Sequence, residues 1–414
     1  MGLCVWTFTF SAILRCGCGA RSCSEDAHPK VALLFLTRAG LLHTELWERW
    51  LSSAANLTDA AHAQQQLCSR EPAEPCERGK QPSYPFGQKL FSVYIHTGVH
   101  PEPGSVAAAA QPSNRFAEFY VRSSILTEWG QPTLIMAERL LLQKGLQDRT
   151  NQRFVLLSES CIPLYSPQLI YQQLMGELRS RINACRNWRG TDDHVHRWAL
   201  VMQQSEPEGA GFVPLDEWRY SSQWKSLNRQ HAELVAADYT IHSLFEERCK
   251  IDNATNLECM ADEHYIPTLL AHLKQEDEVD CLGYLTYNTW DPYRVALMSI
   301  DGHRPVDFKP TFIRPGLIRG MRMVHCSFNH TLAMTRAAGM FIQGEPQENY
   351  HFCFRHIGSY LDSSLQYSCH LFARKFGPQV VGPVLDLISG SACRELGILA
   401  PERCKALATH TDQS

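Results

Sequence analysis

The chain has 414 residues, of which 44% are hydrophobic and 20% are charged. That amount of apolar material suffices for one large α/β domain or two smaller ones. The formal net charge of −4 argues against a nucleic-acid partner, because the phosphate backbone requires a concentrated positive surface. A small negative ligand such as a diphosphate is not excluded, since a few well-placed cations can bind it.

The N-terminal residues 3–14 form an apolar run, which is followed by Arg15 and then by small residues up to Ala20. This run is shorter than the roughly 20 residues that a helix needs to span a bilayer. Residues 1–28 are therefore expected to be a signal peptide or a short type II membrane anchor. The run carries no positive charge before it, and an ordinary buried strand remains the alternative.

The sixteen cysteines indicate an oxidising compartment. They form no C-x-x-C motif; instead Cys68 and Cys76 flank one polar loop, and Cys249 and Cys259 flank another, as is typical of disulfides in secreted proteins. Three N-glycosylation sequons begin at Asn56, Asn253 and Asn329. Together these features predict a glycoprotein of the Golgi or secretory-pathway lumen.

Buried strands and helices alternate along the first half of the chain. Three continuous apolar runs predict strands buried on both faces, at 31–37, 90–96 and 153–159. Helical spacing of apolar residues is found at 43–54, 133–146 and 166–178, and a short strand is expected at 117–121. This alternation predicts an α/β fold with a Rossmann-like, mostly parallel sheet flanked by helices.

The second half is less regular. We expect helices at 222–238 and 262–274, surface insertions near 56–88 and 331–365, and a C-terminal tail over 391–414. Ligands of open parallel sheets bind at the carboxyl ends of the strands. The polar residues predicted at those ends, and hence on the rim that binds a nucleoside, are Thr37, Arg38, His96, Ser158 and Glu159.

Common catalytic and metal-binding signatures are absent from the sequence. It contains no phosphate-binding P-loop, no G-x-G-x-x-G, no nucleophile elbow and no H-E-x-x-H motif. His194 and His196 lie in a polar stretch without a third ligand nearby, which favours solvent exposure over metal binding. No Asp-x-Asp sequence occurs anywhere, and we expect no metal or other cofactor.

Five motifs, in order, carry a resemblance to a known family. They are EWGQPTLIMAERLLLQKGL (128–146), QRFVLLSESCIPLYSPQLIYQQLM (152–175), YSSQWKSLNRQHA (220–232), CMADEHYIPTLL (259–270) and CHLFARKF (369–376). In this order and rough spacing they resemble the core-2/I-branching β-1,6-N-acetylglucosaminyltransferase-like family, in its plant and algal branch. The resemblance extends from Lys30 to about Phe376, and a GT-A domain over 29–390 is therefore expected.

The resemblance implies an inverting, metal-independent glycosyltransferase that moves N-acetylglucosamine or a related sugar from a UDP-sugar to a glycan hydroxyl. Such a reaction needs a base for the acceptor proton and a way to stabilise the departing diphosphate. By their positions in the motifs, the base is Glu263 and one diphosphate-binding cation is Lys375, next to Arg374. Arg322 is a candidate for a second cation, and Arg355 remains possible.

These residues also have simpler interpretations. Glu263 follows Asp262, which is a suitable N-cap, and an acid at a helix start stabilises the helix dipole whether or not it is catalytic. The dipole is also expected to lower the pKa of Glu263 and keep it ionised. Arg374 and Lys375 could equally be a solvated basic end to a strand.

Acceptor binding is predicted for Arg219, Gln223, Trp224 and Trp129. The two tryptophans could stack on a sugar ring, although tryptophans in such segments are more often part of a core. Animal-type relatives have an aspartate near the histidine that ends the second strand, whereas this chain continues Thr97-Gly98. The identity of the donor sugar is therefore left open by the sequence.

Two other classes of function remain at this stage. One is a non-catalytic glycan-binding protein that keeps the GT-A fold. The other is a secreted glycosidase that uses Glu159 and Glu263 as paired carboxylates. The presence of both motif residues, Glu263 and Lys375, favours the transferase, since a non-catalytic protein could lose either one without an effect on folding.

Overall fold

A computed structural model describes eleven segments of the chain. These are residues 28–55, 85–87, 89–98, 114–182, 184, 192–202, 212–252, 257–281, 283–289, 305–323 and 370–404. Several predictions lie outside these segments: the N-terminal segment apart from His28, nearly all of the insertion 56–88, the insertion 331–365, the Cys68–Cys76 loop, Arg355 and the three sequons at Asn56, Asn253 and Asn329.

A six-stranded sheet forms the centre of the fold. Its strands are β1 (Lys30–Thr37), β2 (Phe91–Thr97), β3 (Asn151–Ser158), β5 (Ser180–Arg181), β6 (Ser226–Asn228) and β9 (Val279–Asp280), in the order β2-β1-β3-β6-β5-β9. Strand β1 pairs in parallel with β2 and β3, and within this sheet β6 alone runs against its neighbours. The predicted α/β class with a mostly parallel sheet is confirmed.

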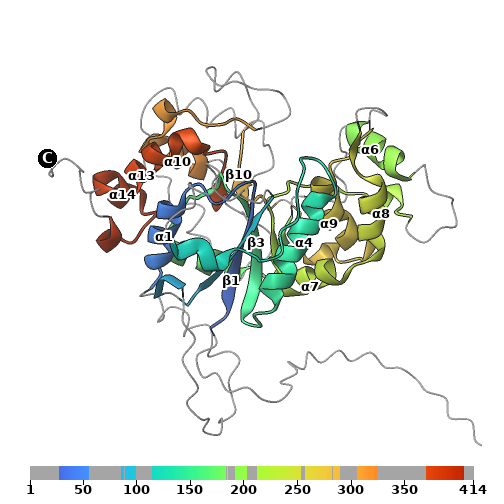
Figure 1. The fold of residues 1–414 in the computed structure, drawn as a ribbon, viewed down its shortest axis with the longest axis horizontal. Coiled ribbons are helices and arrows are strands. Elements are labelled where there is room, and N and C mark those ends of the chain that lie inside the picture. Colours follow the sequence, from blue (N-terminus) through green and yellow to red (C-terminus); the bar gives the residue numbers. More distant parts are fainter. Residues whose placement is uncertain are drawn as a thin grey trace, which may run out of the picture.

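The two faces of the sheet are covered by different sets of helices, because alternate residues of β1 enter two separate cores (Figure 1). Val31, Leu33 and Phe35 belong to one core, which includes residues of α1 (Thr44–Ser52), α5 (Pro167–Gly176), α10 (Pro315–Met323), α13 (Val381–Leu387) and α14 (Gly390–Leu396). Ala32 and Leu34 belong to the other, which includes residues of α4 (Thr133–Leu146), α7 (Arg229–Ala237), α8 (Thr240–Arg248) and α9 (Ala261–His272). Burial on both faces explains why β1 is apolar throughout.

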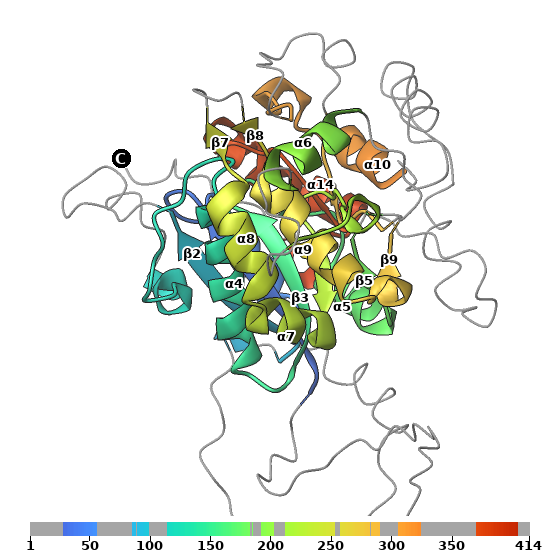
Figure 2. The ribbon, with the colours of Figure 1, turned by 90° about the vertical axis from the view of Figure 1, so that its right-hand side faces the viewer.

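Two smaller sheets complete the fold. Strands β10 (Thr286–Tyr287), β11 (Phe372–Ala373) and β4 (Ile162–Pro163) form one of them, in the order β10-β11-β4. The hairpin of β7 (Ile251–Asp252) and β8 (Leu257–Glu258) is the other, and the disulfide Cys249–Cys259 joins the residues just outside it. This bond confirms the disulfide expected across that loop. Figure 2 shows the hairpin above α8 and α9, near α6 (Asp192–Met202).

Three predicted elements differ in the structure. The strand expected at 117–121 is mostly a short 3-10 helix, Asn114–Phe119. The helix expected at 222–238 begins only at Arg229, because residues 226–228 pair with β3 as strand β6. The Asn228 side chain then caps α7 by accepting a hydrogen bond of 2.8 Å from the His231 amide. His194 and His196 lie in helix α6 rather than in a loop.

The fold continues beyond residue 390. Helix α14 packs in the same core as β1, and Leu396, Ile398 and Leu399 are buried there. The disulfide Cys393–Cys404 closes this segment. The predicted start of a C-terminal tail at residue 391 is therefore too early, since the described chain is packed as far as Cys404.

Within the described segments, no helix combines the length and apolar character needed to cross a membrane.

Candidate active site

The strand ends predicted to form a ligand rim meet at one edge of the sheet. In the parallel register of β1, Thr37 lies opposite Thr97 and Leu36 lies opposite Ser158. The buried Thr37 hydroxyl donates to the His96 carbonyl over 2.7 Å. His96 is also buried, and its Nε2 accepts a 3.0 Å hydrogen bond from the Ile125 amide. Both side chains therefore order the backbone at this edge.

Strand β3 ends at Ser158, and Glu159 lies in the turn that follows. The Ser158 hydroxyl lies 3.0 Å from that of Ser160 and 3.3 Å from the Cys161 sulfur. Burial raises the pKa of Glu159, while its own backbone amide, Arg374, Lys375 and the Arg38 amide favour the ionised form. Glu159 thus faces both cations that the sequence predicts for the diphosphate.

Arg374 and Lys375 follow β11 and are held against the end of β3. The amide of the next residue, Phe376, donates to the Ser160 carbonyl over 2.9 Å. The Phe376 carbonyl in turn accepts a 2.8 Å hydrogen bond from Nε2 of the buried His43, which must therefore carry the proton at that nitrogen. These two bonds place the basic pair beside Glu159.

The Arg374 side chain is a half-buried cation without a full set of hydrogen-bond partners among the described residues. It stacks on the Trp224 ring at 4.6 Å from the ring centroid. Its Nε is buried and has no hydrogen-bond partner among the described residues. Burial lowers the pKa of Arg374, and the nearby Cys161, Glu159, Asp307 and Asp262 favour its charged form. A cation in this state is suited to a negative ligand.

Glu263 lies in the first turn of α9. The helix begins after Met260, which has a left-handed backbone with φ of 56° and directly follows the disulfide-bonded Cys259. Asp262 is therefore not the N-cap, as the sequence suggested, but the second residue of the helix. Its side chain is buried, and its Oδ1 has no hydrogen-bond partner among the described residues.

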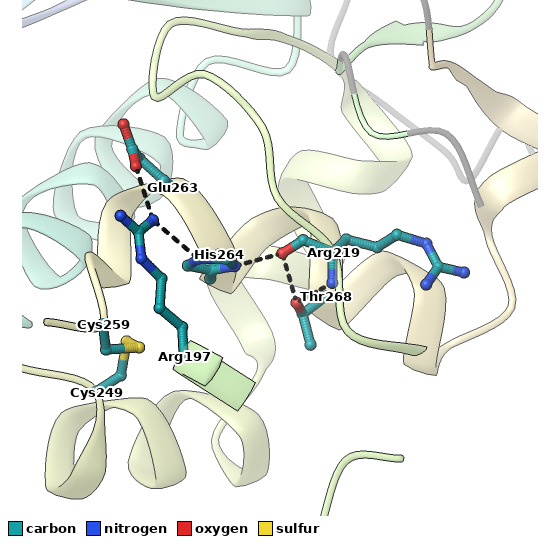
Figure 3. The surroundings of a disulfide bond; sticks show 7 residues. All are labelled: Arg197, Arg219, Cys249, Cys259, Glu263, His264 and Thr268. Atoms are coloured by element: carbon teal, nitrogen blue, oxygen red, sulfur yellow. Dashed lines mark hydrogen bonds and ion pairs between the residues drawn. A yellow bond between two sulfur atoms is a disulfide. The ribbon is translucent and has the colours of Figure 1, made fainter. Parts of the chain in front are cut away.

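The Glu263 carboxylate is paired with Arg197 of α6 (Figure 3). Glu263 Oε2 lies 3.6 Å from Arg197 Nη1, and the Glu263 side chain remains 24% exposed. The same Arg197 nitrogen lies 3.4 Å from His264 Nε2, while His264 Nδ1 lies 2.7 Å from the Arg219 carbonyl. Because a carbonyl only accepts, His264 donates from Nδ1 and accepts at Nε2. This chain of contacts fixes the direction of Arg197 toward Glu263.

The pKa of Glu263 is raised to about 7, in the direction opposite to the one that the helix dipole predicts. Desolvation is the largest cause, followed by the charge of the adjacent Asp262; Arg197 and Lys225 oppose both. A carboxylate with a pKa near neutrality accepts a proton more readily than an ordinary one. Burial and a like charge therefore outweigh the dipole and make Glu263 a better base.

Three of the four residues predicted to bind the acceptor are engaged elsewhere. The Arg219 guanidinium pairs with Glu276 at 2.7 Å and points away from Glu263 (Figure 3). The Gln223 amide donates to Glu138 over 2.9 Å. Trp224 is only 6% exposed and is covered by Arg374. Trp129, at 50% exposed, is the one predicted acceptor residue with an accessible ring.

Arg322 is a structural residue rather than part of the cation pair. Its guanidinium donates to the backbone carbonyls of Leu164 and Leu396 and lies over the Tyr165 ring at 4.6 Å from the centroid. Figure 1 shows α10, which carries Arg322, on the side of the sheet away from α9.

Sequence reasoning missed three charged residues near Glu263: Arg197, Lys225 and Glu138. Glu138 could have been suspected, because it occupies a buried position of α4 together with Ile135 and Leu142. Such an acid within an apolar stripe is rare unless it has a partner. Arg197 and Lys225 belong to no catalytic or metal-binding signature in the sequence, and single cations of this kind are common at the protein surface. The described residues contain no group of three or more side chains that could hold a metal ion.

An α/β sheet with a carboxylate of raised pKa and a basic pair beyond its strands is compatible with a nucleotide-sugar glycosyltransferase. Comparison with known sequences agrees: the family model for the core-2/I-branching enzyme matches residues 67–322. A rice protein (Oryza sativa subsp. japonica) named Glycosyltransferase BC10 is 28% identical over 316 residues, which cover 72% of this chain and 69% of the rice protein.

The chain belongs to the core-2/I-branching enzyme family and is a glycosyltransferase. Its family implies a nucleotide-sugar donor and a glycan acceptor. Catalytic activity, rather than glycan binding alone, is thus its function. The matched segment includes Arg197, Lys225 and Glu263 but ends before Arg374 and Lys375.

Proposed function

We propose that this enzyme transfers N-acetylglucosamine or a related sugar from a UDP-sugar to a glycan hydroxyl, with inversion and without a metal ion. The observation that carries the proposal is the position of Arg374. Its charge acts on Glu159 at the end of β3 and also on Asp262, the neighbour of Glu263. The cations for the leaving group and the base therefore belong to one site.

In the proposed reaction, Glu263 accepts the proton of the acceptor hydroxyl as that oxygen attacks the anomeric carbon of the sugar. The bond between the anomeric carbon and the β-phosphate oxygen breaks, and the electron pair leaves with UDP. Arg374 and Lys375 stabilise the negative charge that develops on the diphosphate. Attack from the face opposite the leaving group inverts the anomeric configuration.

Two features support a metal-free route. The sequence has no Asp-x-Asp, and the corresponding position after β3 reads Ser158-Glu159-Ser160. Two cations already face this position from the end of β11. They can supply the positive charge that a metal ion supplies in other transferases.

Placement in the Golgi or secretory lumen, as a type II membrane protein, is part of the proposal. The disulfides Cys249–Cys259 and Cys393–Cys404 support an oxidising compartment. The apolar run at residues 3–14 supports an N-terminal anchor or signal.

A panel of UDP-sugars tests the donor and the metal requirement together. The purified chain is incubated with each UDP-sugar, with and without EDTA, and release of UDP is measured. We expect release from UDP-N-acetylglucosamine or a closely related donor, at the same rate with EDTA. Loss of release in EDTA would overturn the metal-free route, and no release from any UDP-sugar would overturn the proposed donor class.

A further inference from the structure

Lys225 is a buried cation for which the proposed reaction has no role. It is 1% exposed and lies immediately before β6. Its carbonyl accepts a 3.0 Å hydrogen bond from the Leu156 amide, which fixes its backbone against β3. An isolated buried ammonium costs several kcal/mol, so its surroundings must compensate for its charge.

Three carboxyl groups from two helices lie around it, and burial raises the pKa of one of them, Glu138, to about 8. Glu138 of α4 and both Asp262 and Glu263 of α9 interact electrostatically with Lys225 and favour its charged form against the effect of burial. The Lys225 ammonium also donates to the backbone carbonyl of Asp262 over 3.2 Å. Lys225 thus lies between α4 and the helix turn that carries the base.

The segment that leads to Lys225 is attached to the same helix. The Ser221 amide donates to the Glu263 carbonyl over 2.9 Å, and the Arg219 amide donates to the Thr268 hydroxyl over 3.0 Å. Movement of Lys225 relative to α9 is therefore restricted. Well-packed apolar residues can often replace a buried ionic cluster without loss of stability, so folding alone does not require these charges.

We propose that Lys225 is a positioning residue for the base: its buried ammonium holds the first turn of α9 and keeps Glu263 in the ionised form that accepts the acceptor proton. This inference rests on the proposed role of Glu263. Without Lys225, Asp262 and Glu263 would be two adjacent acids in a desolvated site, and their mutual repulsion would favour protonation. A protonated Glu263 cannot act as the base.

The other charged groups around Glu263 act from other positions, and Arg197 lowers the pKa of Glu263 more than Lys225 does. Arg197 of α6 pairs with the Glu263 carboxylate from the more exposed side. Arg374, after β11, acts on Asp262. Burial, and after it the charge of Glu263, raises the pKa of Tyr220, which stays neutral. Lys225 is the cation here that contacts the helix backbone directly.

The test is an NMR titration of the carboxyl groups in the full chain, with carbon-13 at the glutamate side-chain carboxyls. The Glu263 signal is assigned as the one that is lost in Glu263→Gln. We expect Lys225→Met to raise the midpoint of Glu263 by about one pH unit or more. Lys30→Met is the matched control, because Lys30 pairs with Asp148 at the opposite end of β1 and should leave the midpoint unchanged. An unchanged midpoint in Lys225→Met would overturn the inference.

A second measurement applies even if Lys225→Met does not fold. Coupling between two sites is reciprocal, so Glu263→Gln must lower the titration midpoint of Lys225. That midpoint is measured by NMR with carbon-13 in the lysine side chains. No change in that midpoint would also overturn the inference. Turnover of Glu263→Gln separates the two ideas: an active variant refutes the proposed base, whereas an inactive variant with uncoupled titrations refutes only the role of Lys225.

Discussion

Replacing Glu263 with Gln is expected to reduce kcat for sugar transfer by about 10²- to 10⁴-fold, the range that a positioned general base contributes. Glutamine keeps the size of the side chain and can still contact Arg197, but it cannot accept the acceptor proton. The affinity for UDP should change little, because Glu263 contacts neither Arg374 nor Lys375 in the proposed reaction. The measurement is kcat with the donor found in the UDP-sugar panel, together with UDP binding by calorimetry.

Glu233→Gln is the matched control for this variant. Glu233 is an exposed acid on α7 that pairs with Arg229 at 2.8 Å, as Glu263 pairs with Arg197. Its loss should leave both kcat and UDP affinity at the wild-type level. Wild-type turnover in Glu263→Gln would show that another group is the base.

The second large effect is expected at Arg374. Arg374→Met should reduce kcat by about 10²- to 10³-fold, as the removal of one donor to a developing anion does elsewhere. It should also weaken UDP binding, because the half-buried guanidinium would no longer face the diphosphate. Lys375→Met should act in the same direction. The measurements are kcat and the Kd for UDP.

Arg322→Met is a matched control for Arg374→Met, since both remove a half-buried guanidinium that lies over an aromatic ring. Arg322 donates to the carbonyls of Leu164 and Leu396, so its loss should lower the melting temperature. UDP affinity should remain that of the wild type. Equal losses of UDP affinity in the two variants would contradict the assignment of the diphosphate site to Arg374.

The sequence predicts the sheet well because its strands are buried on both faces. Strands at 31–37, 90–96 and 153–159 and the helix at 133–146 lie within two residues of β1, β2, β3 and α4. Continuous apolar runs and helical spacing are strong local signals. The local pattern predicts a helix that includes residues 226–228, because their pairing with β3 is a long-range interaction that no local pattern reveals.

The candidate site was predictable only in part. Motifs predict roles for Glu263 and for the Arg374–Lys375 pair, and the charge of Arg374 acts on Asp262 beside Glu263. The pKa of Glu263 depends on burial, on Asp262 and on Lys225, and these factors are set by tertiary packing. Gln223 lies in a matching motif and Arg219 directly precedes that motif, yet acidic side chains bind both: Glu276 binds Arg219 and Glu138 binds Gln223. Polarity in the sequence does not show whether a side chain is available to a ligand.

The pH dependence of kcat/KM for sugar transfer tests the role of Glu263 most directly. Because its pKa is raised to about 7, the ionised base is present above that pH and is lost as the pH falls through it. We expect kcat/KM to reach a plateau above about pH 7 and to fall about tenfold per pH unit below it. The residual rate of Glu263→Gln should lack this acid limb. An identical acid limb in Glu263→Gln would contradict the assignment of Glu263 as the catalytic base.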